Sequence, residues 1–293
     1  MNNAIFVAFD DHHWHYFIRL YNSLRENYPD HPILLVHYDG IDPIRCKWIQ
    51  SRSDIRLFHH PELSINLNSM HYHKAVQSRM VYFKYLLWTD QYDEYDNIIH
   101  LDVDTIVLST LDELFEQNNF FVVFNNISFK EVTILPIDRK SKALADYWLG
   151  YHGIKKPEHD DMINAGIFVI PKKYRKEKYL NSLIEITNDF KNLLVYADQS
   201  ALSLWCLKHE ILPSKEYQYN FQLPLFDKFF RSRYKGKLNL GNYFSLKEDI
   251  LNKIKIIHYS GPIKPDCTKF REWRLMGRYK KIFLDCYDKY SGI

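Results

Sequence analysis

Short apolar runs alternate with helical segments through the first hundred residues, and this alternation constrains the fold more than any other feature. Four runs have the length and apolar character of buried strands: 4–9, 33–38, 55–59 and 97–101. Between them, apolar residues recur at helical spacing in three segments: 17–24, 44–49 and 76–87. Strands that alternate with helices form a mostly parallel sheet covered on both faces. The sequence therefore predicts an α/β fold.

The rest of the chain continues this pattern less regularly. Further strands are expected at 120–124, 166–170 and 254–258, and helices at 143–149, 174–191 and 199–208. The residues from Thr110 to Glu113 have the pattern of a capping box, which predicts a short helix. We interpret residues 126–161 as an irregular insertion that shapes a substrate cleft. No repeat or obvious linker interrupts the chain, so we expect one domain over 1–268 and a tail over 269–293.

Composition excludes several classes of protein. With 46% hydrophobic and 26% charged residues, the chain can bury a substantial core, which excludes disorder and coiled coil. A net charge of only +3 argues against a dedicated nucleic-acid binder. The four cysteines form no CxxC pair, so we expect buried thiols rather than zinc ligands. We see no signal peptide and no run near the roughly 20 residues that span a bilayer, and therefore expect a cytoplasmic protein.

Two carboxylates follow the apolar run 97–101. Asp102 and Asp104 are two residues apart, so in an extended chain they point to the same side. Ligands bind at the carboxyl ends of strands in open α/β sheets. Carboxylate oxygens suit Mg²⁺ or Mn²⁺, which typically bridge carboxylates to phosphates. The pair therefore indicates a metal site, with a solvated acidic turn as the alternative.

One enzyme class with such a pair is the haloacid-dehalogenase-like Mg²⁺ phosphotransferases. In that class the first aspartate is the nucleophile and the second a general acid/base. A later acidic pair at a strand end is also needed, but Asp160 and Asp161 follow a polar stretch instead. We keep this class as an alternative to the sugar-nucleotide-dependent glycosyltransferases.

Motifs later in the sequence indicate a site that binds a metal-bound diphosphate. His258 ends an apolar run, and it is followed by Gly261, whose backbone a phosphate can approach, and by Lys264. Asn164 opens another apolar run and offers an amide at its edge. Asp198 and Gln199 stand at a helix start, where a plain N-cap is the alternative interpretation.

Together these motifs resemble glycosyltransferase family 8, a retaining group with the GT-A fold, which includes glycogenin and bacterial lipooligosaccharide galactosyltransferases. The resemblance covers residues 4–266, with the motifs in family order. It implies that Mn²⁺, or Mg²⁺ as the alternative, is held by Asp102, Asp104 and His258. It implies contacts to the UDP-sugar from Ala8, Asp10, Arg79, Asp102, Val103, Asn164, Gly261 and Lys264. Lys84 is an alternative to Arg79, and the implied catalytic residues are Asp198 and Gln199.

Some positions depart from the family pattern. Asp266 stands where the signature usually has tryptophan, and Ser200 replaces the last residue of the common Asp-Gln-Asp. The aspartate that often contacts the donor sugar has no clear match, and three residues compete for that role: Asn125, Asn126 and Asp138. The sequence therefore leaves galactose and glucose both open as the donor sugar.

The resemblance predicts retaining transfer of a hexose from a UDP-sugar to a hydroxyl of a cell-envelope oligosaccharide or polysaccharide, such as lipopolysaccharide or capsule. A non-catalytic sugar-nucleotide-binding protein is a second alternative. The tail 269–293 mixes basic and aromatic residues, which predicts peripheral contact with the inner face of the cell membrane and is consistent with a lipid-linked acceptor. A helix packed on the domain would explain the same pattern. No role is assigned to the histidines that cluster in two other segments: His12, His13, His15, His71 and His73.

Overall fold

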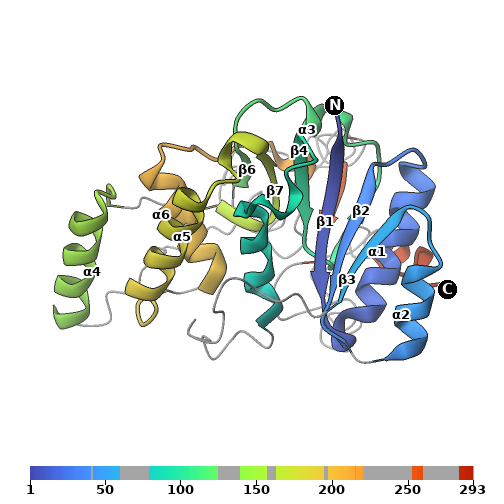
Figure 1. Cartoon of the computed structure of the whole chain (residues 1–293), viewed down its shortest axis with the longest axis horizontal. Coiled ribbons are helices and arrows are strands. Elements are labelled where there is room, and N and C mark those ends of the chain that lie inside the picture. Colours follow the sequence, from blue (N-terminus) through green and yellow to red (C-terminus); the bar gives the residue numbers. More distant parts are fainter. Residues whose placement is uncertain are drawn as a thin grey trace, which may run out of the picture.

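A six-stranded sheet runs through the centre of the molecule (Figure 1). The computed structural model describes residues 1–40, 42–59, 79–124, 139–156, 163–194, 197–214, 216–220, 253–259 and 284–292. The strands lie in the order β3–β2–β1–β4–β7–β6. Their bounds are β1 (Asn3–Phe9), β2 (Ile33–Tyr38), β3 (Ile55–His59), β4 (Asn97–Leu101), β6 (Phe121–Phe124) and β7 (Ile163–Pro171). Neighbouring strands are parallel except where β7 pairs with β4 and β6, so the predicted mostly parallel sheet is confirmed.

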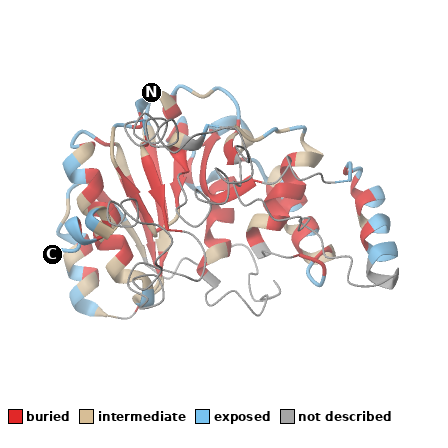
Figure 2. Cartoon of the chain, turned by 180° about the vertical axis from the view of Figure 1, so that it is seen from behind, coloured by how far each residue is buried: buried red, intermediate tan, exposed pale blue. Residues whose placement is uncertain are grey.

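Helices cover both faces of this sheet. One face carries α1 (Trp14–Asn27) and α2 (Pro43–Gln50), and the other carries the 3-10 helix η3 (Arg79–Trp88), α5 (Glu177–Asp189) and α6 (Ala197–Lys208). The alternation of β1 explains the two layers, because Ile5 and Val7 pack on α1 whereas Ala4 and Phe6 pack beneath η3. Figure 2 shows the result, with buried strands between helices whose outer faces are exposed.

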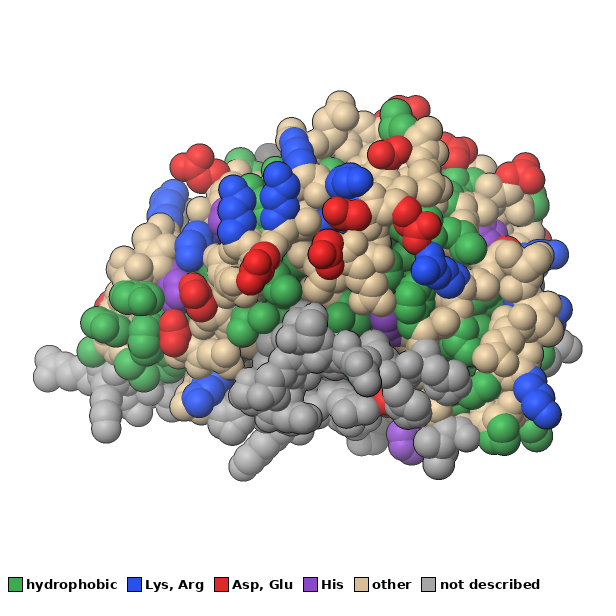
Figure 3. Space-filling view, in the orientation of Figure 1, with side chains coloured by type: hydrophobic (Ala, Val, Ile, Leu, Met, Phe, Trp, Pro, Cys, Tyr) green, Lys and Arg blue, Asp and Glu red, His purple; other side chains and the backbone are tan. Residues whose placement is uncertain are grey.

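The remaining elements are short or lie at the edges. A second, two-stranded sheet pairs β5 (Thr105–Val107) with β8 (Ile256–His258). The short helices are α3 (Asp112–Phe115), η1 (Asp11–His13), η4 (Asp90–Tyr92), η6 (Lys172–Tyr174) and η7 (Tyr217–Tyr219). Helix α4 (Arg139–His152) stands at the end of the molecule farthest from α2 (Figure 1). On the face in Figure 3, basic and acidic side chains lie interspersed.

Most predicted elements are present, with two differences. The helix expected at 143–149 is confirmed, and it is longer than expected, because α4 extends over Arg139–His152 within the segment 126–161. The short helix after Thr110 forms, but its N-cap is Leu111 and no side chain caps it, so the capping-box prediction is wrong. The described part of the 76–87 segment is a 3-10 helix instead of an α-helix. Tertiary packing accounts for the 3-10 helix, because η3 is buried between the sheet and α5.

The last described residues, 284–292, are packed on α1. Tyr287 and Tyr290 are buried in the core that α1 covers. The Arg19 guanidinium lies 3.9 Å above the ring of Tyr287, and its Nε donates to the Tyr287 carbonyl over 3.0 Å. Residues 269–283 lie outside the described part, so the boundary at residue 268 and the membrane contact stay predictions. Among the described residues, no helix is both long and apolar enough to cross a membrane.

Candidate functional site

Two carboxylates and one imidazole meet beyond the carboxyl end of β4. The turn after β4 is closed by the carbonyl of Asp102, which accepts from Thr105 N over 3.2 Å and Thr105 Oγ1 over 2.8 Å. Thr105 then pairs with His258 across β5 and β8, which brings the imidazole beside the turn. His258 Nε2 lies 3.2 Å from Asp104 Oδ1 and 3.8 Å from Asp102 Oδ2. One ligand atom from each of the three residues lies within 4.8 Å of the others.

A glycine on β7 makes this convergence sterically feasible. A Cβ atom on Gly166 would lie 2.3 Å from His258 Cε1 and 2.7 Å from Asp102 Oδ2. The Gly166 N–H donates to Asn164 Oδ1 over 2.9 Å, and its carbonyl accepts from Asp102 N over 2.7 Å. The Asn-Ala-Gly motif therefore supplies both an amide side chain and a position without a side chain next to the ligand cluster.

Lys84 connects this cluster to a second carboxylate. Its side chain is buried, and Nζ lies 3.2 Å from Asp102 Oδ1 and 2.8 Å from Asp198 Oδ2, and donates to the Ala165 carbonyl over 3.0 Å. Burial by itself lowers the pKa of Lys84, but the two carboxylates outweigh it and raise that pKa above its ordinary value. The ammonium is therefore charged. The side chain of Arg79, which the sequence favoured over Lys84, is outside the described part.

The two implied catalytic residues lie in the first turn of α6. Asp198 is buried, and burial raises the pKa of its carboxyl group although Lys84 opposes that shift. Gln199 accepts from Asn164 Nδ2 through Oε1 over 3.4 Å. Both residues are thus connected to the metal-ligand cluster, one through Lys84 and one through the Asn-Ala-Gly motif. The structure thus brings segments 164–166 and 198–199 together, and the catalytic roles stay a prediction.

Two further site residues were missed by sequence reasoning. The first is the buried His100, whose Nε2 lies 3.0 Å from Asp102 Oδ1. Burial lowers the pKa of this ring to about 4, so the ring is neutral and donates its proton to the carboxylate. Burial by itself would raise the pKa of Asp102, but Lys84 and the neighbouring histidines hold it well below its usual range. The second residue is Asn220, whose Oδ1 lies 3.0 Å from His258 Nδ1. His100 was readable from its i−2 position relative to Asp102, whereas Asn220 belongs to no motif.

Asp10 lies at the carboxyl end of β1, on the same edge of the sheet. Its carboxylate caps η1 by accepting from His12 N and His13 N over 3.1 and 3.3 Å, and Oδ1 lies 2.6 Å from His13 Nδ1. Phe6 on β1 pairs with His100 on the parallel strand β4. Two residues further along both strands, this register places Ala8 beside Asp102. Val103 is buried between the two acidic residues. Ala8 and Asp10 therefore lie on the edge that the sequence predicted for nucleotide binding.

Several residues that the sequence analysis names lie outside the described part of the chain: Gly261, Lys264, Asn125, Asn126, Asp138, Asp160, Asp161, Asp266, His71 and His73. The roles expected for Gly261 and Lys264 stay predictions. The described cysteines, Cys46, Cys206 and Cys286, are free thiols.

Comparisons with known proteins agree with this geometry. A family model described as glycosyl transferase family 8 matches residues 4–265. The galactosyltransferase LgtC, solved with donor and acceptor sugar analogs, is similar at 21% identity and a TM-score of 0.63, covering 99% of this chain and 97% of LgtC. The glycosyltransferase GlyE of Streptococcus pneumoniae TIGR4 is similar at 18% identity and a TM-score of 0.60, over 99% of this chain and 60% of GlyE.

A third similar structure is mouse xyloside xylosyltransferase 1, at 13% identity and a TM-score of 0.53, over 90% of this chain and all of that protein. A comparison with curated protein sequences gave no match. At these identities the structural likeness establishes the fold, and it confirms the predicted single GT-A domain with a mostly parallel sheet.

Proposed function

The chain belongs to glycosyl transferase family 8, and from this membership and the site geometry we propose that it transfers a hexose from a UDP-sugar to an acceptor hydroxyl, with retention at the anomeric carbon. The observation that carries the proposal is the convergence of Asp102, Asp104 and His258 within 4.8 Å at the carboxyl edge of the sheet. Family membership makes the chain a glycosyltransferase and sets aside the phosphotransferase alternative. The donor, acceptor and metal are parts of the proposal.

The donor atoms of the cluster fit a divalent metal ion. Two carboxylates and one imidazole suit Mn²⁺ better than Mg²⁺, since Mg²⁺ prefers a shell of oxygen atoms. Asp102, Asp104 and His258 would hold the ion, which supplies Lewis-acid stabilisation of the departing diphosphate. Lys84 and His100 keep Asp102 ionised and oriented through contacts of 3.2 and 3.0 Å. Gly261 and Lys264 would hold the remaining phosphate charge, as the family resemblance implies.

Retention requires either a covalent intermediate or departure and attack on the same face of the sugar. The family resemblance implies that Asp198 lies near the donor sugar, but its Oδ2 is already held by the Lys84 ammonium at 2.8 Å. An ion-paired carboxylate is a weakened nucleophile, and the amide of Gln199 is a poor one. We therefore favour same-face transfer, with Asp198 orienting the sugar hydroxyls.

In the proposed transfer, the bond from the anomeric carbon to the diphosphate oxygen breaks, and its electron pair leaves with UDP. The acceptor oxygen forms a bond to the anomeric carbon on the same face, and its proton goes to a phosphate oxygen of the departing UDP. A glycosyl adduct trapped on Asp198 and detected by mass spectrometry would replace this mechanism with double displacement.

The acceptor and the location are further parts of the proposal. We propose a cell-envelope oligosaccharide or polysaccharide as acceptor, and the LgtC structure with donor and acceptor sugar analogs supports a carbohydrate acceptor. The basic and aromatic residues of 269–293 support a cytoplasmic enzyme that contacts the inner face of the membrane, where a lipid-linked acceptor would lie. Galactose and glucose remain the two proposed donor sugars.

A thermal-shift measurement combined with product analysis tests the proposal. UDP with Mn²⁺ should raise the melting temperature more than UDP with EDTA or GDP with Mn²⁺, because a bound ligand stabilises the folded state. UDP-sugar turnover in the same sample then separates an enzyme from a binding protein. Stabilisation without turnover by any UDP-hexose, even with sugar acceptors present, favours the binding protein. No stabilisation by UDP contradicts the proposed donor.

A further inference from the structure

His258 has a buried hydrogen bond on the side of its ring that faces away from the carboxylates. Its Nδ1 lies 3.0 Å from Asn220 Oδ1, and the two residues are 2% and 0% exposed. An amide oxygen only accepts, so the proton of this bond is on Nδ1. In the neutral ring the lone pair is then on Nε2, the atom that lies 3.2 Å from Asp104 Oδ1.

The chain segment that carries Asn220 is fixed in place by contacts to β8 and α3. The Lys255 N–H donates to the Gln218 carbonyl over 2.8 Å, so residues 217–220 run beside β8. The buried Tyr219 donates its hydroxyl to Glu113 Oε1 over 2.7 Å, and the same oxygen pairs with Lys255 Nζ. The position of Asn220 is therefore set by packing and hydrogen bonds that involve no ligand.

The proton of the neutral His258 ring can lie on either Nδ1 or Nε2. If it moved to Nε2, it could be donated to Asp104 Oδ1, and the lone pair that a metal ion needs would be lost. Asn220 offers an acceptor to the other nitrogen and so stabilises the tautomer in which Nε2 is free to ligate. Hydrogen bonds of this kind to metal-bound histidines typically change metal affinity by about 10–100-fold.

We propose that Asn220 is a positioning residue that holds His258 in the tautomer and orientation required to bind the metal ion. This inference rests on the proposed function, because it concerns the Mn²⁺ site of that reaction. It assigns a role to a buried residue that contacts one of the proposed metal ligands and is not a ligand itself. It also explains why a polar side chain is buried at residue 220 beside the apolar strand β8.

The test is a titration of the full-length, metal-free protein with Mn²⁺, followed by the electron paramagnetic resonance signal of free Mn²⁺. Asn220→Ala and Asn220→Leu both remove the acceptor, one leaving space and one filling it, and both should raise the Mn²⁺ Kd about 10–100-fold. Asn220→Asp keeps an acceptor oxygen and should restore most of the affinity. Asn97→Ala is the matched control, because Asn97 is a buried asparagine that donates to the Phe115 carbonyl away from the cluster.

A second readout needs no metal. In protein labelled with ¹⁵N-histidine, long-range nitrogen–proton spectra report which ring nitrogen carries the proton, and His258→Ala identifies the signals. Wild-type His258 should carry the proton on Nδ1, and Asn220→Leu should move it to Nε2. Unchanged Mn²⁺ affinity and an unchanged tautomer in folded Asn220 variants would overturn the inference. A wild-type protein that binds no Mn²⁺ would instead overturn the proposed metal site, and the spectra would still decide whether Asn220 sets the tautomer.

Discussion

The Lys84 ammonium lies 2.8 Å from Asp198 Oδ2, and both side chains are buried. The same ammonium also contacts Asp102 over 3.2 Å, so one positive charge joins the implied catalytic carboxylate to a ligand of the metal-ion cluster. Breaking such a buried pair leaves an uncompensated charge, which typically costs about 3–5 kcal/mol. The free energy of unfolding and the activity of the site should therefore both depend on Lys84.

Lys84→Met should lower the free energy of unfolding by about 3–5 kcal/mol at pH 7.5, measured by urea denaturation. The loss should shrink at acidic pH, because Asp198 can be protonated once the ammonium is gone. Lys255→Met is the matched control, since Lys255 pairs with Glu113 in a partly exposed position and should cost about 1 kcal/mol or less. Equal losses for the two variants would show that the buried Lys84 contacts stabilise the folded state no more than the partly exposed Lys255–Glu113 pair does.

Gly166→Ala should disrupt the ligand cluster. The added methyl group would lie 2.3 Å from His258 Cε1 and 2.7 Å from Asp102 Oδ2, so the imidazole or the carboxylate must move. We expect weakened Mn²⁺ binding and lower stability. Gly150→Ala provides the control, because Gly150 lies in α4 with nothing within 4 Å of the new Cβ. That helical substitution should raise stability by up to about 1 kcal/mol. Wild-type Mn²⁺ affinity in Gly166→Ala would contradict the steric argument.

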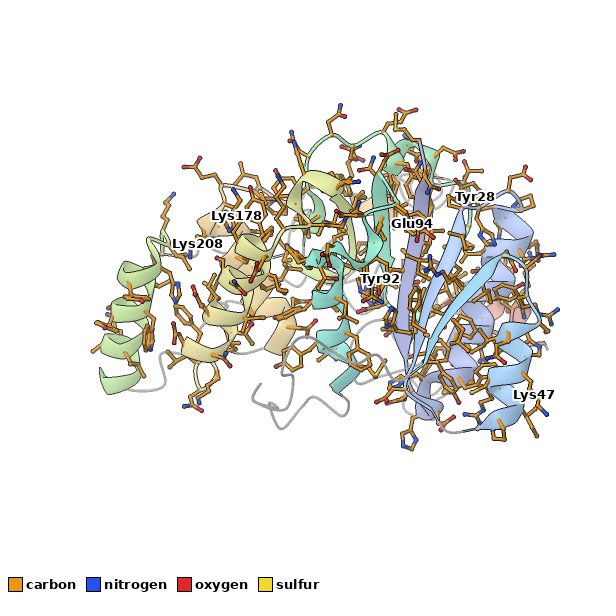
Figure 4. All side chains as sticks on the ribbon, viewed as in Figure 1. Tyr28, Lys47, Tyr92, Glu94, Lys178 and Lys208 are labelled. Carbon is orange, nitrogen blue, oxygen red and sulfur yellow. The ribbon has the colours of Figure 1, made fainter. Side chains whose placement is uncertain are left out.

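His37 should make stability pH-dependent in the acidic range. Burial lowers the pKa of its ring to about 3. The ring stacks on Phe58 and contacts the hydroxyl of Tyr92, and Tyr92 itself packs on Phe6 of β1 (Figure 4). The unfolded chain has an ordinary histidine pKa of about 6.5, so it binds more protons than the folded state between the two values. The His37 contribution is therefore complete above about pH 6.5 and decreases as the pH falls toward 3.

Urea denaturation between pH 7.5 and 4.5 measures this effect, with His37→Phe for comparison. The stability of the wild type relative to the variant should fall by up to about 1.4 kcal/mol per pH unit below pH 6.5. A constant difference over that range would show that His37 becomes protonated without leaving its buried position.

The packing of residues 284–292 changes how membrane contact should be tested. Deleting 269–293 removes the buried Tyr287 and Tyr290, so we expect loss of stability besides any loss of membrane binding. Tyr287→Ala alone should cost about 3–5 kcal/mol, by comparison with other large aromatic truncations in cores. Charge reversal at Arg271, Arg274 and Arg278 instead leaves the buried Tyr287 and Tyr290 in the chain. If 269–293 contacts anionic membranes, these reversals should abolish binding to anionic vesicles without changing the melting temperature.

The sequence predicts the strands and part of the ligand cluster for a physical reason. Buried strands are marked by continuous apolar runs, and Asp102 and Asp104 directly follow such a run, so their place at the carboxyl edge follows from the parallel sheet. The family resemblance implies His258 as the third ligand, and the antiparallel pairing of β5 with β8 brings it to the turn. The resemblance favours Arg79 over Lys84, because the family has an arginine before an apolar helical residue and Arg79 precedes Met80. Only the three-dimensional structure reveals the two carboxylates that make the burial of Lys84 stable. Asn220 is unpredictable from local pattern, because its partner His258 is 38 residues away.

The most direct test of the central claim is the release of UDP from UDP-galactose and UDP-glucose, with Mn²⁺ or with EDTA, beside the corresponding GDP-sugars. Asp104→Asn is the matched variant, because it keeps the shape of the side chain but removes a charged ligand of the cluster. The account predicts Mn²⁺-dependent release from one UDP-hexose, abolished by EDTA and by Asp104→Asn. Release that persists in EDTA, or that is unaffected by Asp104→Asn, would contradict it.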